Sequence, residues 1–558
     1  MMRNTGKLLV AVSGLALMCN PAFAQSTTPL NAPSPGTVLT PPPPAPDLRK
    51  REVPELREEL GLPDGSQKVL NFRISQVRIV GATVIEEDKI AAQFAGLLDR
   101  AITAAELRAS LDQANQLYTD AGYALGRAYI PVQVIQRGTL IVRVVEGFVG
   151  EINITAEDPA VRHMVEEFSK QIVSEKPLRS ATLERYLLLI NDIPGVTLGG
   201  KLTGMNVYTG AATLALTTDS EKVSVSTAVD NRANLENSPF AAYLTGSLNN
   251  IFGMGDQVSV TALASPEMDT QQYFRGTFST FIGADGLRAT LGAAYAKSET
   301  PDLPPGFELV STSTQVDFLL SYPIIRATKE TLTSFFGAYM TNASNELNGF
   351  KFSEDAIRAV HVGGTYASQI SEDVSLGGNF RLTQGLSIGG AGPDNTLHSR
   401  LGATPNFTKV QTGFSVNYAA TDRLLLSFRT DGQYSPDSLY SSEEISFGGA
   451  RFARGYNNSE ISGDSGLGAS VQASYRFDVE TLGGWAVTPY TFLDHSKVWN
   501  TDVDGQGNHR LLSTGIGVTF SNRRWLSVGL ELDKPINRTP SSQDNKDPRL
   551  FVSFEVRF

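Results

Sequence analysis

From about residue 223 to the C-terminus, apolar and polar residues alternate with a period of two, and no helical stretch of any length interrupts them. Around residue 275, for example, Phe274 and Phe278 fall on one face of an extended chain, and Arg275 and Thr277 fall on the other. Alternation over this length predicts a sheet with one apolar and one polar face. A transmembrane β-barrel requires this arrangement, because lipid tolerates only backbone whose polar groups are all hydrogen-bonded within the protein.

The number of strands follows from the length of this region. About 335 residues, at about 21 residues per strand and connection, give about 16 strands. Counted backward from the C-terminus, the last predicted strands cover residues 549–558, 525–534, 510–520, 485–498 and 467–479. Short and long connections alternate between them, and in such barrels the short turns face the periplasm and the long loops the exterior. Residues of about 440–464 therefore fall in the sixth long loop.

The composition agrees with a barrel and excludes two other classes. Only 41% of the residues are hydrophobic and the mean hydropathy is −0.12, which excludes a bundle of transmembrane helices. The net charge of −11 argues against nucleic acid as a partner, because phosphate binding requires a basic surface.

The N-terminal residues 1–24 are typical of a secretory signal peptide. Arg3 and Lys7 form a basic start, residues 8–18 an apolar middle, and Ala22-Phe23-Ala24 a small-x-small cleavage site. Cys19 is the only cysteine, so the predicted mature chain contains none.

Residues 25–70 form a predicted linker. It begins with a proline-rich stretch that includes Pro41–Pro44, which predicts an extended, polyproline-like segment. The charged segment 47–60 is predicted to form a short helix after Pro54. Either a plug of the barrel or a plain tether agrees with this pattern.

Two predicted α+β domains, 71–147 and 148–222, lie between the linker and the barrel. In both, the periodicity predicts the order strand–helix–helix–strand–strand. The predicted elements are 74–80, 86–98, 104–121, 128–135 and 139–145 in the first domain, and 151–155, 159–172, 181–191, 196–203 and 212–218 in the second. Leu140, Val142 and Val144 alternate onto one face, which we expect to be buried.

The loop at about 440–464 contains Arg454-Gly455-Tyr456, and Phe492 and Asp494 follow on a later strand. With these motifs the chain resembles the TpsB transporters of two-partner secretion, the haemolysin secretion/activation type, within the POTRA-containing outer-membrane superfamily. The resemblance implies that the loop folds into the pore and that Arg454 pairs with Asp494 on the barrel wall. The match departs at Ala453, where the family usually has Val.

The two α+β domains resemble the POTRA domains of this family, both in element order and in sequence. The matching residues are Gly122, Tyr123, Pro131, Gln133, Glu146 and Gly147 in the first domain, and Leu183, Asn191, Pro194 and Gly195 in the second. At the other end of the chain, Phe558 resembles the C-terminal signal that the barrel-assembly machinery reads.

Three short patterns resemble enzyme or metal sites but are incomplete. Residues 463–466 (Gly-Asp-Ser-Gly) mimic a protease nucleophile segment without a credible upstream His. Residues 494–496 (Asp-His-Ser) are neighbours on a predicted strand and point to opposite faces. Residues 500–505 copy the start of a calcium loop, but Leu511 stands where the loop requires Glu. The prediction is therefore not an enzyme, with no cofactor and no metal.

The resemblance implies an outer-membrane transporter with its POTRA domains in the periplasm. Its partners would be an unfolded exoprotein cargo of the TpsA-like, adhesin or haemolysin type, the barrel-assembly machinery during biogenesis, and outer-membrane lipid. The POTRA domains would recognise the cargo by strand addition. Two alternatives stay open at this point: a barrel-assembly insertase of the same superfamily and a passive porin. The sequence does not name the cargo or the oligomeric state.

Overall fold

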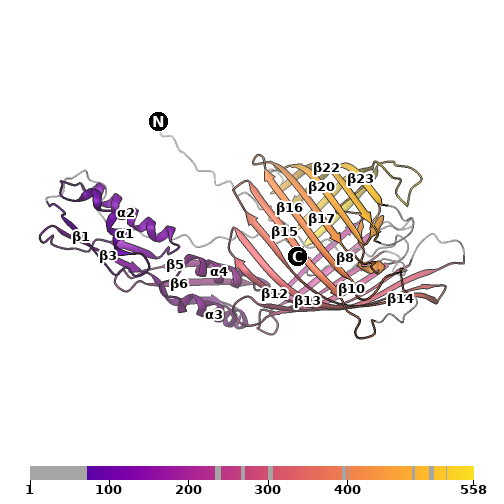
Figure 1. Cartoon of the computed structure of the whole chain (residues 1–558), viewed down its shortest axis with the longest axis horizontal. Helices are drawn as coiled ribbons and strands as arrows, with labels where there is room; N and C mark the ends of the chain where they lie inside the picture. The colour runs from indigo at the N-terminus through magenta and orange to yellow at the C-terminus, as the bar shows by residue number, and fades with distance from the viewer. Residues whose placement is uncertain are drawn as a thin grey trace.

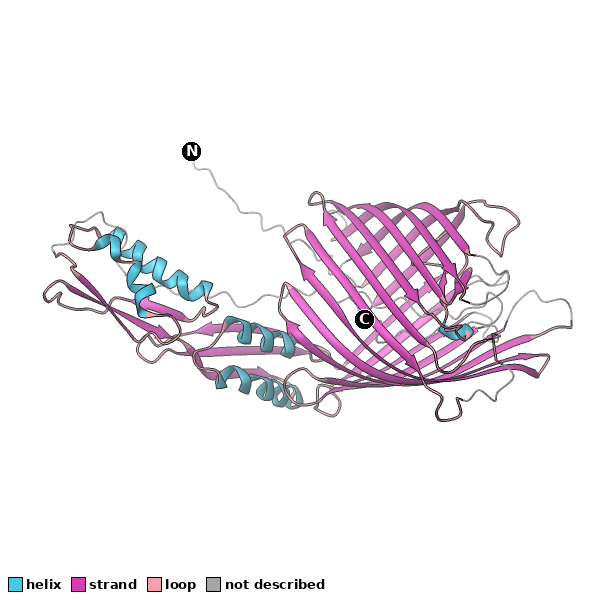
Figure 2. Cartoon of the chain, viewed as in Figure 1, coloured by secondary structure: helices cyan, strands magenta, loops and turns pink. Residues whose placement is uncertain are grey.

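The computed structural model describes residues 72–557, apart from 233–239, 266–270, 300–305, 392–397, 401, 480–483, 502–507 and 523–524. The predicted signal peptide, the linker and Phe558 lie outside this range. Two α+β domains form an arm that extends from one end of a β-barrel (Figure 1). The α-helices gather in the arm (Figure 2). No helix among the described residues is long and apolar enough to cross a membrane.

The first domain has a three-stranded sheet in the order β1-β3-β2. Its elements are β1 (Gln76–Val80), α1 (Glu87–Ala92), the 3-10 turn η2 (Ala95–Leu97), α2 (Ala104–Asp120), β2 (Gly126–Tyr129) and β3 (Thr139–Glu146). A capping box starts α2: the Thr103 hydroxyl accepts from the Glu106 N–H, and the Glu106 carboxylate accepts from the Thr103 N–H at 2.7 Å. The burial predicted for alternate residues of β3 is confirmed, because Leu140, Val142 and Val144 are all buried.

Two predicted elements of this domain were too long. The helix predicted for 86–98 breaks after Ala92 into a 3-10 turn, and the strand predicted for 128–135 ends at Tyr129. Pro131 has no N–H to contribute to a sheet. The side chain of Gln133 replaces the missing strand: its amide nitrogen donates to the Ile141 oxygen at 2.7 Å, and its oxygen accepts from the Ile141 N–H at 2.9 Å.

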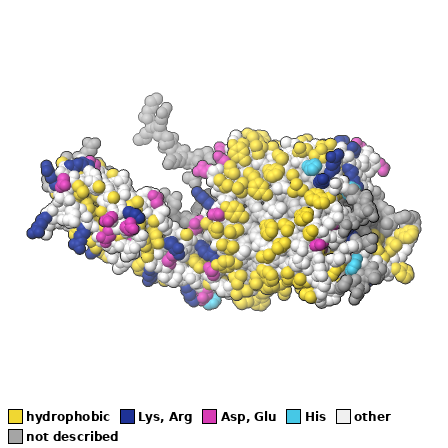
Figure 3. All heavy atoms as spheres, viewed as in Figure 1, with side chains coloured by type: hydrophobic (Ala, Val, Ile, Leu, Met, Phe, Trp, Pro, Cys, Tyr) yellow, Lys and Arg dark blue, Asp and Glu magenta, His cyan; other side chains and the backbone are white. Residues whose placement is uncertain are grey.

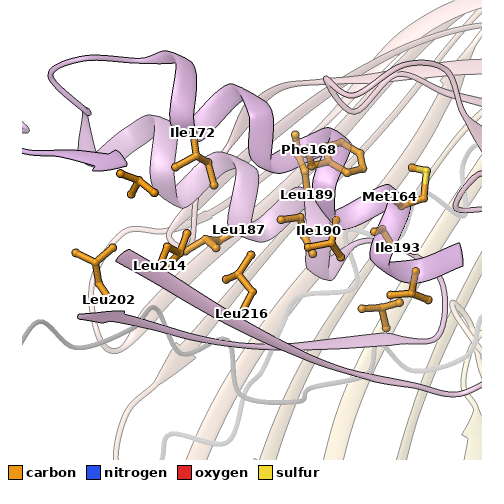
Figure 4. Close-up of a cluster of buried hydrophobic side chains, with 14 of the residues drawn as sticks. Met164, Phe168, Ile172, Leu187, Leu189, Ile190, Ile193, Leu202, Leu214 and Leu216 are labelled. Atoms are coloured by element: carbon orange, nitrogen blue, oxygen red, sulfur yellow. The ribbon is translucent and has the colours of Figure 1, made fainter. Parts of the chain in front are cut away.

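The second domain repeats the same order with a sheet β4-β6-β5. Its elements are β4 (Phe148–Ala156), α3 (Pro159–Ser174), α4 (Ser180–Asn191), β5 (Val196–Thr203) and β6 (Ala211–Ser220). Each predicted element is present, with its ends shifted by no more than a few residues. Figure 4 shows the core, in which Phe168 and Ile172 of α3 and Leu187 and Ile190 of α4 pack over leucines of the sheet. Burial of these side chains is the main stabilising term of the domain.

The remaining strands close into a barrel. They are β7 (Val223–Asp230), β8 (Ala241–Asn249), β9 (Gln257–Ala264), β10 (Gln271–Phe281), β11 (Arg288–Glu299), β12 (Leu309–Arg326), β13 (Glu330–Leu347), β14 (Phe350–Gln369), β15 (Val374–Gly385), β16 (Thr408–Ala419), β17 (Leu424–Tyr434), β20 (Ser465–Tyr475), β21 (Phe477–Val479), β22 (Trp485–Trp499), β23 (His509–Asn522), β24 (Leu526–Pro535) and β25 (Arg549–Arg557). Since β20 and β21 both pair with β22, they form one interrupted strand. The described residues therefore form 16 strands, as predicted.

The two faces of the wall differ as the alternation predicts. Hydrophobic side chains form a broad belt across the face of the barrel that is visible in Figure 3. On β10, Phe274 is 48% exposed in this belt, whereas its neighbour Arg275 is only 7% exposed. Arg275 forms a bidentate ion pair with Asp317 at 2.8 and 2.9 Å. A polar inner wall of this kind surrounds a lumen rather than an apolar core.

The second domain docks on the end of the barrel that carries the short turns. Phe168 of α3 stacks edge-on against Phe281 at the end of β10, with ring centroids 5.4 Å apart. On α4, Arg185 donates to the Pro323 oxygen at 2.8 Å. Asp192, the C-cap of α4, accepts two hydrogen bonds of 2.7 Å from Arg326 at the end of β12. We call this contact the junction.

Candidate functional site

Residues 435–464 connect β17 to β20. This connection folds back against the inner wall of the barrel and contains a short hairpin. We call it the pore loop. It contains the 3-10 turn η3 (Ser441–Glu443) and the strands β18 (Ile445–Phe447) and β19 (Ile461–Gly463), which pair with each other. Its tip, residues 448–460, is largely buried. Phe447 and Phe452 stack edge-on with centroids 5.8 Å apart, so much of the apolar contact lies within the loop itself.

Arg454 at the tip contacts Asp494 of β22 through three donors. The backbone N–H and Nε donate to Oδ2 at 3.1 and 3.0 Å, and Nη2 donates to Oδ1 at 3.0 Å. The guanidinium carbon lies 3.3 Å from the centre of the Phe492 ring. The Arg454 side chain is 8% exposed and that of Asp494 is 0% exposed. Phe492 and Asp494 share one face of β22, because strand residues two apart point the same way.

Two further wall residues complete the shell around Arg454. On β20, Gln472 accepts from Nη1 at 2.9 Å and Ser470 accepts from Nη2 at 3.3 Å. Ser470 in turn donates to Asp494 Oδ1 at 2.7 Å. The arginine fork is thus satisfied by a carboxylate and two neutral oxygens, which a lysine would not reproduce.

The residues beside Arg454 let the tip approach the wall. A Cβ at Gly455 would lie 2.9 Å from the Pro535 nitrogen, so any side chain there would force the loop away. The Tyr456 hydroxyl lies 2.8 Å from Asn537 Oδ1 and accepts from the Arg538 N–H at 3.2 Å. Ala453 has a φ of 55°, a left-handed conformation that a β-branched residue would adopt only at a large cost.

The acidic pair on β24, Glu531 and Asp533, was not predicted from the sequence. Glu531 lies 3.5 Å from Arg454 and accepts from the Tyr490 hydroxyl at 2.7 Å. Both carboxylates also contact Arg232, just after β7. A signal was available: two carboxylates two residues apart fall on the inward face of a predicted strand, where burial requires counter-charges. The sequence could not show which cations supply them.

The base of the pore loop is held on other strands. Glu443 forms an ion pair of 2.6 Å with Lys409 of β16 and accepts from the Tyr339 hydroxyl of β13 at 2.8 Å. Asp464, which belongs to the false protease pattern, accepts from the Leu439 N–H at 2.8 Å and pairs with Arg400. Carboxylates therefore fix the loop at both its base and its tip.

The POTRA-like residues of the first domain lie at its turns and its border with the second. Gly122 has a φ of 82°, and its oxygen accepts from the Ser180 N–H at 2.8 Å. Tyr123 packs on the first core, and Gly147 leaves room for Leu125, which enters the core of the second domain. Pro131 and Gln133 end β2 and cap β3, as described above.

Glu146 ties three segments of the first domain together. Its carboxylate accepts from the Thr83 N–H at 2.7 Å, from the Val84 N–H at 2.9 Å and from the Tyr118 hydroxyl at 3.0 Å. Burial raises the pKa of Glu146, but these hydrogen bonds outweigh burial and hold the pKa below its usual range.

The POTRA-like residues of the second domain lie around α4 and face the barrel end. Leu183 packs on the core. Asn191 accepts from the Leu198 N–H at 3.1 Å, which fixes the turn that contains Pro194. Gly195 has a φ of 72°, and a Cβ there would lie 2.8 Å from the Asn249 side chain of β8. Gly195 is therefore needed both for the turn and for docking.

Within the described ranges, the residues of the enzyme-like and metal-like patterns do not come together as a site. Asp494 and Ser496 are buried, whereas His495 between them is exposed on the other face of β22. No group of His, Cys, Asp and Glu within the described ranges could hold a metal ion. Residues 502–507, which contain most of the calcium-like pattern, lie outside those ranges.

Comparisons with known proteins agree with this architecture. The sequence model of the family described as "Haemolysin secretion/activation protein ShlB/FhaC/HecB" matches residues 210–520, and that of "POTRA domain, ShlB-type" matches residues 72–147. The chain is 22% identical over 499 residues to the heme/hemopexin transporter protein HuxB of Haemophilus influenzae (strain 86-028NP), covering 86% of each chain. It is 24% identical over 476 residues to the hemolysin transporter protein ShlB of Serratia marcescens, covering 83% of this chain and 81% of that protein.

A solved structure has the same fold. CdiB from Escherichia coli superposes with a TM-score of 0.72 at 20% identity, covering 91% of this chain and 94% of that chain. The family model itself covers more than half of the chain. The chain therefore belongs to the ShlB/FhaC/HecB family of haemolysin secretion/activation proteins, the outer-membrane β-barrel transporters of two-partner secretion with POTRA domains in the periplasm.

Proposed function

We propose that this transporter moves one large, unfolded exoprotein from the periplasm to the cell surface, and that the pore loop leaves its wall contacts while the cargo passes. The observation that carries the proposal is the buried pairing of Arg454 with Asp494 inside a polar-walled barrel. A loop held by charges can exchange these contacts for water as it moves, because hydration of the separated ions offsets much of the lost pairing. The roles of Gly455, Tyr456 and Phe492 are to let the tip approach and to position Arg454.

The arm is proposed to capture the cargo by strand addition. Beside β3, residues 130–135 do not pair as a strand, and the side chains of Val132 and Val134 are fully and largely exposed. Exposed apolar side chains next to an incompletely paired strand suit an extended apolar segment of an unfolded protein. The names of the relatives, transporters of hemolysin and of heme/hemopexin, support a cargo of the adhesin or haemolysin type.

Further partners follow from the outer surface and the C-terminus. The apolar belt in Figure 3 would contact outer-membrane lipid. The barrel-assembly machinery would recognise Phe558 during biogenesis. We propose no enzymatic activity, no cofactor and no nucleic-acid partner.

The test is an in-frame deletion of the gene, followed by quantitative proteomics of the culture supernatant, the cell surface and the outer membrane. We expect the loss of one large exoprotein with other barrel proteins unchanged, which would also identify the cargo. Depletion of many outer-membrane barrels would instead indicate an assembly insertase. Loss of small-solute uptake alone, with all exoproteins retained, would indicate a porin.

A further inference from the structure

Arg232 lies where the first and last strands of the barrel meet. The seam between β7 and β25 pairs over Ser226–Asp230 and Ser553–Arg557, five residue pairs among the described residues, whereas β25 pairs with β24 over eight. Beyond the last pair, the Asn231 side chain continues the ladder: its oxygen accepts from the Val552 N–H at 2.7 Å, and its amide donates to the Leu550 oxygen at 3.0 Å. Asn231 thereby fixes the backbone that carries Arg232.

The Arg232 side chain points from this seam into the cluster around the loop tip. It pairs with Glu531 and lies 3.4 Å from Asp533 on β24. Its guanidinium carbon is 3.8 Å from the centre of the Phe551 ring on β25. The side chain is only 12% exposed, so these contacts are shielded from water.

Arg232 also contacts the pore loop directly, through two hydrogen bonds that each join a side chain to a backbone oxygen. Its Nη1 donates to the Arg454 oxygen at 3.4 Å, and its own backbone oxygen accepts from the Asn458 amide at 2.6 Å. The residues on either side of the loop's turn, 454 and 458, are thus both attached to one residue of the seam. Neither contact depends on the Arg454 side chain.

Arg232 brings a second cation to the acidic cluster at the loop tip. Asp494, Glu531 and Asp533 are three carboxylates with side chains 0%, 8% and 0% exposed. Arg454 pairs closely with only one of them, and its contact with Glu531 is 3.5 Å long. Unpaired carboxylates at this depth are costly, and Arg232, which forms ion pairs with both Glu531 and Asp533, lowers that cost with the tip inserted.

We propose that Arg232 is a second positioning residue for the pore loop, which holds the tip in the lumen together with Arg454 and links it to the β7–β25 seam. The inference rests on the pore-loop role proposed above, and it adds a residue outside the loop and its known motif. The tip then leaves the wall only when both arginines release the acidic cluster.

The test uses the mature full-length protein, which the signal-peptide prediction leaves without cysteine. A single Ile461→Cys substitution places a thiol on β19, where the side chain is 3% exposed against Val498 and Leu511. The rate of maleimide labelling of the detergent-purified barrel reports release of the loop, since a buried thiol reacts only after local opening. The labelling rate is measured without export of any cargo. The proposal for Arg232 can therefore be wrong while the proposed transport function holds, and the transport function can be wrong while the proposal for Arg232 holds.

In this background we expect Arg232→Ala to accelerate labelling by about tenfold or more, because a buried ion pair is lost. Arg275→Ala is the matched control: it removes a lumenal arginine from a bidentate carboxylate pair that does not touch the loop, and labelling should stay unchanged. Adding Arg232→Ala to Arg454→Ala should increase the rate by a smaller factor than Arg232→Ala does in the parent protein, since both residues act on one cluster. Arg232→Gln, which keeps a polar though shorter side chain and removes the charge, serves if the alanine variant does not assemble.

Labelling of Arg232→Ala or Arg232→Gln at the rate of the parent protein would overturn the proposal. So would an equal acceleration by Arg275→Ala, because the effect would then be a general loosening of the barrel. Full additivity of the two alanine substitutions would show that Arg232 and Arg454 do not hold a common element.

Discussion

The pore loop and the second arm domain are both attached to the barrel, the loop on its inner wall and the domain at its end, but by different kinds of contact. At the loop tip, the contacts with the wall are chiefly charged: Arg454 with Asp494, surrounded by Gln472 and Ser470. At the junction, an aromatic stack of Phe168 on Phe281 accompanies the ion pair of Asp192 with Arg326. The stack of Phe447 on Phe452 lies within the loop and moves with it, and the same apolar cluster also includes Val498 and Leu511 of the wall.

This difference indicates which attachment is built to be released. Separating an ion pair into a wet lumen returns hydration to both charges, so the net cost is smaller than the pairing energy suggests. Separating Phe168 from Phe281 exposes apolar surface to water at about 25 cal/mol per Å², with no compensation. We therefore expect the loop to move during transport while the second domain stays on the barrel. The following predictions test this contrast.

The largest effect is expected for Arg454→Ala. It leaves Asp494 buried without its counter-charge, a loss of about 3–5 kcal/mol for a broken buried pair. We expect the barrel to assemble and export of the cargo to fail, measured as the amount of the exoprotein that disappears on gene deletion. Arg275→Ala should export normally. Normal export by Arg454→Ala, with equal barrel abundance, would contradict the role of the tip.

Phe281→Ala should weaken the attachment of the second domain to the barrel. It removes the ring that stacks on Phe168 and leaves a cavity, which costs about 3 kcal/mol. We expect faster hydrogen exchange in α3 and α4, measured by mass spectrometry, with no change in thiol labelling of Ile461→Cys. If the loop is released as well, the two attachments are coupled rather than independent.

Gly455→Ala separates geometry from charge at the loop tip. The added methyl would lie 2.9 Å from the Pro535 nitrogen, and overpacking of this kind costs about 1–3 kcal/mol. We expect export below that of the parent protein but above that of Arg454→Ala. Gly276→Ala is the control, because nothing lies within 4 Å of a Cβ there. Export equal to the control would show that close approach of the tip is not required.

The smallest effect is expected for Asp285→Asn, in the short turn between β10 and β11. Asp285 accepts from Tyr322 at 2.6 Å and from Tyr186 at 3.0 Å, but its side chain is 53% exposed, so the loss should be about 1 kcal/mol or less. Hydrogen exchange in α4 measures it. A loss as large as that of Phe281→Ala would mean that charge also dominates the junction.

The pH dependence of the same contact has a defined sign. Burial raises the pKa of Asp285, but the hydrogen bonds of Tyr322 and Tyr186 and the charge of Arg185 lower the pKa below its ordinary value of 3.8. The stabilisation of the junction by this group is therefore present above pH 3.8 and is lost as the pH falls through the lower, folded pKa. Exchange in α4 should rise on acidification in the parent protein and less so in Asp285→Asn.

Local features of the fold could be predicted where one residue pattern decides the outcome. The alternation around Phe274 and Arg275 predicted which side chain points outward and which inward, and the count of 16 strands is confirmed. The prediction was wrong where a side chain replaced backbone pairing: β2 ends at Tyr129, and the amide of Gln133 takes the place of a strand. Periodicity cannot distinguish these two ways of satisfying Ile141.

The candidate site divides in the same way. The pairing of Arg454 with Asp494 was expected only from the resemblance to a family, since nothing in the spacing of 40 residues requires it. The second cation, Arg232, and its partner Glu531 are 299 residues apart and were not predicted. Asp464 belongs to a pattern that resembles a protease segment, whereas in the structure it anchors the base of the loop.

The sequence by itself determined the order of elements in the two arm domains, the number of barrel strands and the alternation that sends strand residues inward or outward, some inward carboxylates among them. These properties depend on neighbours along the chain, through the periods of strand and helix. Only the tertiary structure decided which cations meet them. Closing the barrel brings the end of β7 beside β24 and β25, and the tip of the pore loop lies against these strands. The energy of buried charges depends on their distance in space rather than on their distance along the chain.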